Sequence, residues 1–481
     1  MKNVATNRIP NKLWKYRVVV CCWSILLTGC MVGPNYHTPT ESMPSHFTNS
    51  KPHSSTKQFH SSWWPSLKDP MLVSLINQAL HQNWDIQQAE AKIRQSRAEL
   101  NISSADYFPQ LNASGKISRD HLSANSELLS SIPFKIPLNY TDNKLEFDAS
   151  WELDLFGHTR RSVEASNSTF QSTIENTNDT ALRVAAEVAK NYIQYRTYQQ
   201  RIIIAKHTIA SYKKTAKLIT LRMHAGNASS VDVERIESQA LSAEASLPPL
   251  QAEMRATLAA LAVMINEYPE SLYTRLNQVA RIPVIKSALS IGTPSDLLQK
   301  RPDIRAAERN LAAATANIGV ATANQFPRFQ LVGDIGSDTV VPGTFAQAAS
   351  RYWSYGPQIY LPIFQAGRLR NAVKENKAMR DSIFAEYKKS VLQALADVES
   401  ALIRNEKEKL REKNLLLSYK QIQSSVRLIQ LQYVTGKSTL MDVLDVQRQA
   451  DELHDQYVQA MGQVAINQVS LYKALGGAVM R

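Results

Sequence analysis

The twelve residues KLEFDASWELDL, from Lys144 to Leu155, decide the fold class of this chain. Apolar residues at 145, 147, 149, 151, 153 and 155 alternate with polar or charged residues at the positions between them. A strict period of two is typical of a β-strand with one apolar and one polar face. Such a strand is either half-buried in a soluble sheet or part of the wall of a membrane barrel. A length of about 10–12 residues suits a tilted membrane strand.

The chain is one structural unit used twice. The block that begins at Asp85 recurs 218 residues later at Asp303, and the block around Gly226 recurs 210 residues later around Gly436. The difference of eight predicts a longer loop in the first copy, between 120 and 142. We therefore divide the chain into a signal segment 1–29, a tether 30–68 rich in Ser, Thr, Pro and His, a first repeat 69–290 and a second repeat 291–481.

Each repeat is predicted to hold a helix, two strands and a long helical hairpin. The first helix ends at a Phe-Pro pair, because proline disfavours a continuing helix. The long helices carry apolar residues at spacings of 3 and 4 and then reverse at a glycine, which indicates antiparallel coiled-coil hairpins. The predicted spans are 70–105, 111–118, 144–155 and 160–223 in the first copy, and 296–323, 329–335, 353–363 and 368–433 in the second.

The fold class is thus mostly α with a small β part. Four strands cannot close a barrel, and an open strand edge is not tolerated in lipid. If the strands lie in a membrane, the chain must therefore oligomerise.

The first thirty residues resemble a lipoprotein export signal. Five basic residues and no acids precede the apolar stretch from Val18 to Leu27, and Leu27-Thr28-Gly29-Cys30 follows. Cys21 and Cys22 would be removed with the signal, which leaves Cys30 as the first mature residue. We predict a diacylglycerol on its thiol. That lipid is the only non-protein group we expect; no cofactor and no metal are predicted.

Composition excludes several other classes of protein. The 44% hydrophobic and 20% charged content of the 481 residues is that of a folding chain, and only 16 are glycine, which favours long helices. No apolar run reaches the roughly 18 residues that a membrane-spanning helix needs. The net charge of +13 would suggest nucleic acid, but five of these charges lie in the signal, so no nucleic-acid partner is expected.

Several motifs follow one another along the chain: CMVGPNY at 30–36, Trp64 with DPML at 69–72, WELDLFG at 151–157, RPDIRAAE at 301–308, PIF at 362–364 and DVLD at 442–445. In this order they resemble the TolC-type outer membrane factors, in particular the lipoprotein branch of RND-type efflux systems called the NodT family. The resemblance implies a homotrimer whose chains each give four strands to a 12-stranded barrel and paired helices to a periplasmic tunnel. It also implies a passive duct in the outer membrane that docks with a periplasmic adaptor protein and an inner-membrane pump.

The reversal after the second long helix holds the candidate gate. Met441, Asp445 and Arg448, together with Glu452, share one helix face. In tunnels of this family that tip closes inward and acidic rings constrict it, so the resemblance makes Asp442 and Asp445 the ring positions. Threefold symmetry would bring like charges together, which cations or Arg448 must balance. Plain solvated surface remains the alternative.

A second candidate is a lock between neighbouring hairpins. By the resemblance, Asp232 and Tyr433 match positions that tie hairpins shut. The matching basic position is occupied by Ser438, and Lys437 beside it is the possible substitute.

Other functions are weighed against the efflux channel. A channel for type I protein or peptide secretion would look much alike, and a structural coiled-coil envelope lipoprotein would need the helices but not the alternating strands. The ten histidines form no H-x-x-x-H pair, and the chain has no P-loop and no G-x-S-x-G, so an enzyme is not expected. The exported substrate is not predicted.

Overall fold

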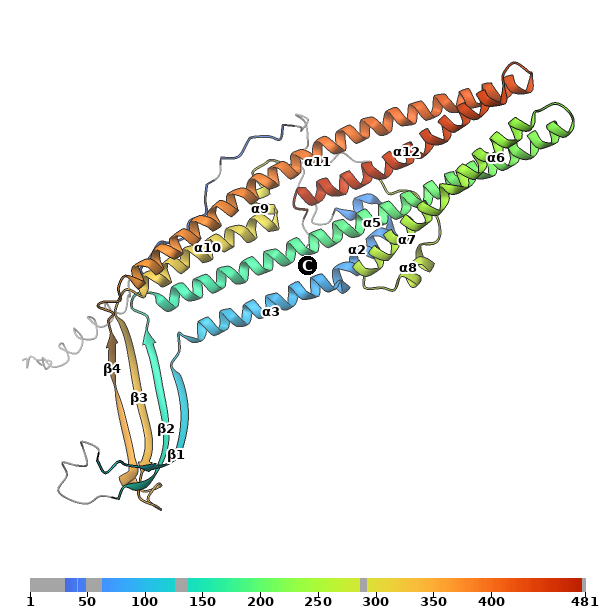
Figure 1. Cartoon of the computed structure of the whole chain (residues 1–481). Helices are drawn as coiled ribbons and strands as arrows, with labels where there is room; N and C mark the ends of the chain where they lie inside the picture. Colours follow the sequence, from blue (N-terminus) through green and yellow to red (C-terminus); the bar gives the residue numbers. More distant parts are fainter. Residues whose placement is uncertain (1–30, 41, 49–62, 126–136, 286–291, 478–481) are drawn as a thin grey trace, which may run out of the picture. The chain divides into compact units, whose positions relative to one another are not determined.

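The computed structural model describes residues 31–40, 42–48, 63–125, 137–285 and 292–477 (Figure 1). The predicted signal 1–29 and the predicted lipidation site Cys30 lie outside the described residues. No helix in the described ranges combines the length and the apolar character that a bilayer crossing requires.

Four antiparallel strands form one sheet in the order β1-β2-β3-β4, and they span Gln110–His121, Asn139–Leu153, Arg328–Thr339 and Arg351–Tyr360 (Figure 1). Gln110 pairs with Ser150, and Arg328, 218 residues after Gln110, pairs with Tyr360, 210 residues after Ser150. The eight-residue difference between the repeats therefore lies wholly between β1 and β2, as the sequence predicts.

The register places the alternating residues on two distinct faces. One row crosses all four strands on the apolar face and consists of Ala113, Phe147, Ile335 and Trp353. The adjacent row on the opposite face consists of Asn112, Asp148, Asp334 and Ser354. The strand prediction is confirmed, although β4 ends at Tyr360 rather than at 363, opposite Arg328, the first residue of its partner strand β3.

Two very long helices dominate the rest of the fold. α5 (His158–His224) and α11 (Arg368–Val434) have 67 residues each, about 100 Å at 1.5 Å per residue. Each reverses at a tip, α5 into α6 (Ser230–Ala245) and α7 (Leu247–Met264), and α11 into α12 (Leu440–Ala474) (Figure 1). The remaining elements are η1 (Trp64–Leu67), α2 (Pro70–Gln82), α3 (Trp84–Ala105), α8 (Pro269–Leu276), α9 (Asp296–Lys300), α10 (Pro302–Ala323) and η2 (Ala348–Ser350).

The predicted helices 70–105 and 296–323 are each broken in two, so both predictions were wrong in this respect. In the first, Asn83 leaves the helical conformation, and its Oδ1 accepts the N–H groups of Asp85 (2.9 Å) and Ile86 (3.2 Å). This bond pattern caps the start of α3. Its Nδ2 donates to the carbonyl of Met264 at 2.8 Å. In the second, Arg301 is extended (ψ 120°), because the residue before a proline, here Pro302, is disfavoured from the helical conformation.

The returning helix of the first hairpin is also interrupted, whereas that of the second is continuous. α6 ends at Ala245 and α7 begins at Leu247, with Pro248 in its first turn. Proline is tolerated there because the first N–H groups of a helix lack a helical partner anyway. The two hairpins are therefore not equivalent.

Contacts divide the chain into two compact units, each of which contains parts of both repeats. The first consists of Met1–Pro39, Gln95–Gln171 and Arg309–Ala385, and the second of Thr40–Arg94, Ser172–Glu308 and Glu386–Arg481. The repeats are shared in this way because β1 and β2 of one copy and β3 and β4 of the other form a single sheet.

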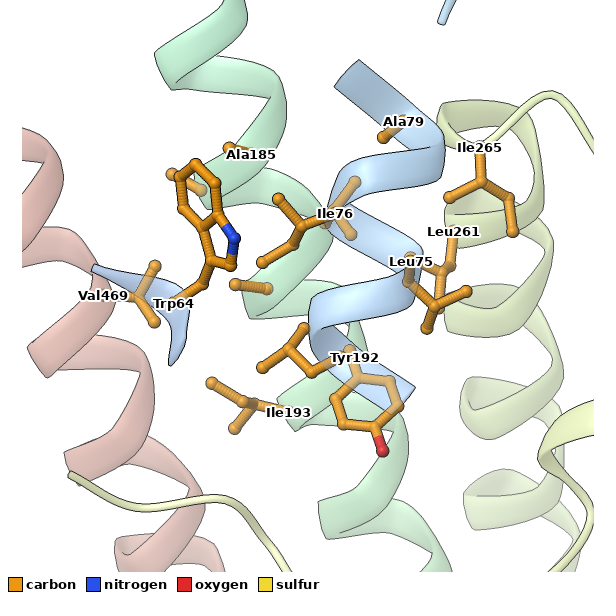
Figure 2. Packing of buried hydrophobic residues seen from close by; sticks show 14 of the residues in the cluster. Trp64, Leu75, Ile76, Ala79, Ala185, Tyr192, Ile193, Leu261, Ile265 and Val469 are labelled. Atoms are coloured by element: carbon orange, nitrogen blue, oxygen red, sulfur yellow. The ribbon is translucent and has the colours of Figure 1, made fainter. Parts of the chain in front are cut away.

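The main hydrophobic core lies in the second unit. Figure 2 shows side chains of η1, α2, α5, α7 and α12 gathered in one cluster, among them Trp64, Ile76, Tyr192, Leu261 and Val469. A further cluster includes Phe47, which is only 2% exposed. Parts of the predicted tether are thus packed rather than solvated.

A third cluster occupies the hairpin end of the same unit. Tyr212 and Ile219 of α5 pack against Ile236 of α6, and Leu440 of α12 belongs to the same cluster. With Ala216 between them, these α5 residues stand at the predicted spacings of 4 and 3, so the coiled-coil seam is confirmed for α5 and α6.

Candidate functional site

The tips of the two hairpins share one backbone motif. Gly436 has a φ of 75°, and its N–H donates to the carbonyl of Tyr433, while the N–H of Lys437 donates to Gln432 at 2.8 Å. This pair of bonds is a Schellman motif, in which a left-handed residue, usually glycine, ends a helix. The tip at Gly226 (φ 76°) has the same two bonds. The glycines that mark the reversals in the sequence are therefore required by the turn.

A capping box begins the returning helix at both tips. The N–H and hydroxyl of Thr439 donate to the carboxylate of Asp442 at 2.8 and 2.7 Å, and the N–H of Asp442 donates to the Thr439 hydroxyl at 3.3 Å. Ser229 and Asp232 form the same arrangement at the other tip. Reciprocal bonds of this kind satisfy N–H groups that the helix leaves without partners.

The capping box gives one of the two predicted ring aspartates a structural role. The hydroxyl and the N–H of Thr439 hold the pKa of Asp442 below its usual value. The carboxylate of Asp442 thus stays ionised while it caps α12. Its place in a charged ring is not excluded by this role, and the gate remains a prediction.

The remaining gate residues lie on one face of α12, as predicted. Arg448 is placed between two acids, with Asp445 at 3.7 Å and Glu452 at 3.2 Å. The side chains of Arg448 and Asp445 are 48% and 57% exposed, so this pair stabilises the fold by at most about 1 kcal/mol. Met441 is exposed, and its sulfur accepts a long contact of 3.7 Å from Arg235. Unlike Asp442, Asp445 is not part of the cap of α12; its ion pair is the exposed one with Arg448.

The predicted lock residues are not joined within the chain. Asp232 is engaged by Ser229, and the ring of Tyr433 lies under the guanidinium of Arg222 at 5.0 Å. In the described part of the chain, no hydrogen bond or ion pair links Asp232 to Tyr433 or to the ammonium of Lys437. A lock between neighbouring copies stays a prediction.

A second functional region is the segment that follows Cys30. The N–H of Val32 donates to the carbonyl of Phe156 at 3.1 Å, just after the end of β2. A side chain at Gly157 would collide with Met31, because a Cβ there would lie 2.7 Å from the methionine Cγ. The segment is thus held where β2 gives way to α5.

Arg161 is the residue that holds this segment, and sequence analysis missed it. It is fully buried, and its guanidinium donates to the carbonyls of Val32 (3.2 Å) and Gly33 (3.3 Å) and to Oδ1 of Asn35 (2.7 Å). A fourth bond of 2.7 Å reaches Glu164. No local pattern could have revealed it, because the partners lie about 130 residues earlier in the chain. The capping boxes, in contrast, have a local sequence pattern, since Ser229 and Thr439 each stand three residues before an aspartate.

The docked segment packs tightly against α10 and α5. A Cβ on Gly33 would lie 2.5 Å from the Cα of Gly319, and a Cβ on Gly319 would lie 2.8 Å from the side chain of Arg161. Both glycines are therefore needed for the close approach of the segment to α10 and α5. Among the described residues, no group of three or more His, Cys, Asp or Glu side chains is arranged to hold a metal ion.

Sequence and structure comparisons identify the class of protein. A family model described as "Outer membrane efflux protein" matches residues 75–267 and 293–477. The chain belongs to this family. This chain is 30% identical over 429 residues to "Nodulation protein T" of Rhizobium leguminosarum bv. trifolii, and the match covers 89% of this chain and 90% of the relative.

Further relatives of this outer membrane efflux protein agree with that assignment. It is 29% identical over 467 residues to the "Toluene efflux pump outer membrane protein TtgF" of Pseudomonas putida, covering 94% and 95% of the two chains. The solved outer-membrane channel OprN superposes with a TM-score of 0.86 at 32% identity, covering 93% of this chain and 99% of that one. The protein is an outer membrane efflux channel and not an enzyme.

Proposed function

We propose that three copies of the chain form a passive duct from the periplasm to the exterior. Each copy contributes four strands to a 12-stranded barrel and its hairpins to a periplasmic tunnel. The duct receives its cargo from an inner-membrane pump through a periplasmic adaptor. The names of the relatives support small organic molecules as the cargo class, since one of them belongs to a toluene efflux pump.

One observation carries this proposal: the sheet is incomplete in the single chain. Within the described part of the chain, its order leaves β1 and β4 with one unpaired edge each. Its apolar face is also uncovered, with Phe147 45%, Ile335 60% and Trp353 68% exposed. An exposed apolar face suits lipid, and unpaired edges in lipid require partner strands. Pairing β1 of one copy with β4 of the next supplies the partner strands, and the apolar face then lies against lipid.

The polar face of the sheet supports its role as the lumen. Asn112 donates to Asp148 across β1 and β2 at 2.9 Å, and Ser354 bonds to Asp334 across β3 and β4. A barrel whose wall alternates in this way is apolar toward lipid and polar toward its water-filled interior.

Cysteine cross-linking tests the barrel directly. The chain after Cys30 has no cysteine, so introduced thiols would be the only free ones once Cys30 is acylated. Ser114→Cys on β1 is combined in turn with Ser354→Cys, Gly356→Cys or Gln358→Cys on β4, all on the polar face. Neighbouring strands bring Cα atoms within the distance that a disulfide spans.

We expect at least one combination, in protein extracted from the outer membrane, to yield covalent trimers under mild oxidation. The single variants serve as controls and should remain monomeric on a denaturing gel. If no combination forms cross-linked species while the native protein is still trimeric, the edges do not meet and the closed barrel is refuted.

We also propose a lipid on Cys30 and a gate at the hairpin tips. The docking of Val32 beside the end of β2 supports the first, because it would hold the acylated residue close to the strands. The exposed carboxylate of Asp445 supports the second. Three copies of it around one axis would attract cations into the aperture.

A further inference from the structure

A cavity of about 470 Å³ opens between α5, α11 and α12, away from the hairpin tips and inside the second unit. Ile203 and Ile204 of α5 and Val426 of α11 contribute apolar wall. Tyr419 of α11 adds an aromatic surface and stacks on His454 of α12, with ring centroids 4.3 Å apart. Cavities of this size with apolar walls and few polar groups are typical of small-molecule sites.

The acidic side chain among the lining residues is Asp451 of α12. Its Oδ1 accepts a bond from Gln447 at 3.2 Å, and its Oδ2 is buried. Burial raises the pKa of Asp451, although the hydroxyls of Thr208 and Tyr212 on α5, which hydrogen-bond to the carboxylate, lower it. A buried carboxylate whose charge is not balanced by an ion pair favours the arrival of a cation.

The other charged or titratable groups around the cavity do not supply that cation. Arg427 of α11 is exposed, and no ion pair joins it to Asp451 among the described residues. Burial lowers the pKa of His454, which is therefore neutral at neutral pH. His207 of α5 also lines the cavity, and a positive charge there favours the ionised form of Asp451, although no ion pair joins the two among the described residues.

We propose that this cavity binds an organic cation with an apolar or aromatic body. The cationic nitrogen meets Oδ2 of Asp451, and the body lies against Tyr419, Ile203 and Val426. Tyrosine faces attract such cations, and ionised Asp451 supplies the opposite charge. All the residues that line the site belong to one chain, and none of them is a candidate gate residue.

Ethidium, a permanently charged aromatic cation, is a suitable probe for the full-length protein in detergent. We expect saturable binding of one ethidium per chain at pH 7.5, followed by fluorescence. Asp451→Asn keeps the shape of the side chain and should weaken binding at least tenfold. Glu406→Gln removes the same charge from an exposed position of α11 outside the cavity and should leave binding unchanged.

Acidification should weaken binding to the wild-type protein, because protonation of Asp451 removes its charge. The Asn variant should lose most of this pH dependence. Val426→Trp, which fills the cavity without changing its charge, should also abolish saturable binding. If Asp451→Asn fails to fold, the Val426→Trp variant alone tests whether ethidium binds in this cavity. Wild-type ethidium affinity in both folded variants would overturn the proposal, as would the absence of saturable binding to the wild-type protein.

Discussion

Replacement of Arg161 by methionine should release the segment that follows the lipidation site. The change removes three bonds to that segment, at 3.2 and 3.3 Å to the carbonyls of Val32 and Gly33 and at 2.7 Å to Asn35. Hydrogen bonds to a charged group contribute about 1.5–3 kcal/mol each. At the lower limit, three of them amount to about 4.5 kcal/mol of docking free energy.

Hydrogen exchange measures this loss at the backbone itself. The N–H of Val32 is protected in the docked state by its bond to Phe156. Because each 1.4 kcal/mol is a factor of ten, a loss of about 4 kcal/mol should speed exchange in residues 31–39 roughly a thousandfold. Amides of β2 should keep their protection, which separates undocking of the segment from unfolding of the unit.

Arg160→Met is the matched control. Among the described residues, the side chain of Arg160 is bonded to Asp154, just after the end of β2, and not to the clamped residues 32–35. The control should leave exchange in 31–39 unchanged, although the same charge is lost one residue away. If Arg161→Met retains wild-type protection at Val32, the guanidinium is not what holds the segment, and the clamp must be abandoned.

Three further predictions concern the anchor, the strands and the gate. Cys30→Ser should abolish labelling by radioactive palmitate and leave uncleaved precursor; persisting label would refute lipidation. Phe147→Arg places a charge on the apolar face at a cost of about 2–4 kcal/mol and should reduce the amount of trimer in the membrane. Asp148→Arg, on the polar face, should not, and equal damage would contradict the assignment of the faces. Asp445→Asn should weaken cation selectivity and block by divalent cations in a planar bilayer. Thr439→Ala breaks the cap of α12 but keeps every carboxylate, so identical changes in both variants would trace the effect to the cap rather than to ring charge.

The strands and the long helices could be predicted because their patterns are local. The alternation from Lys144 to Leu155 needs no knowledge of a partner strand, and α5 begins within two residues of its predicted start. The repeat offsets even located the longer loop. The sheet order and the register could not be derived in the same way, since they depend on pairing between residues far apart in the chain.

The errors arise where distant contacts or single side chains decide the backbone. The break at Asn83 is fixed partly by its bond to Met264, 181 residues later. The break before Leu247 had a local signal in Pro248 and Pro249, which the apolar spacing concealed. At the gate, the sequence analysis treated Asp442 only as a charge. The Thr439-x-x-Asp442 spacing is also the pattern of a capping box, so its structural role could have been predicted.

The close fit of Gly33 against Gly319 and Arg161 imposes an order of events on the maturing chain. The surface that receives the segment is made by α5 and α10, which belong to different repeats and are separated in the chain by α6, α7, α8 and α9. The segment therefore has no place to dock until both helices have come together. If the lipid is added to Cys30 at export, this residue is attached to the membrane first. The segment that follows it docks on the protein only after α5 and α10 have come together.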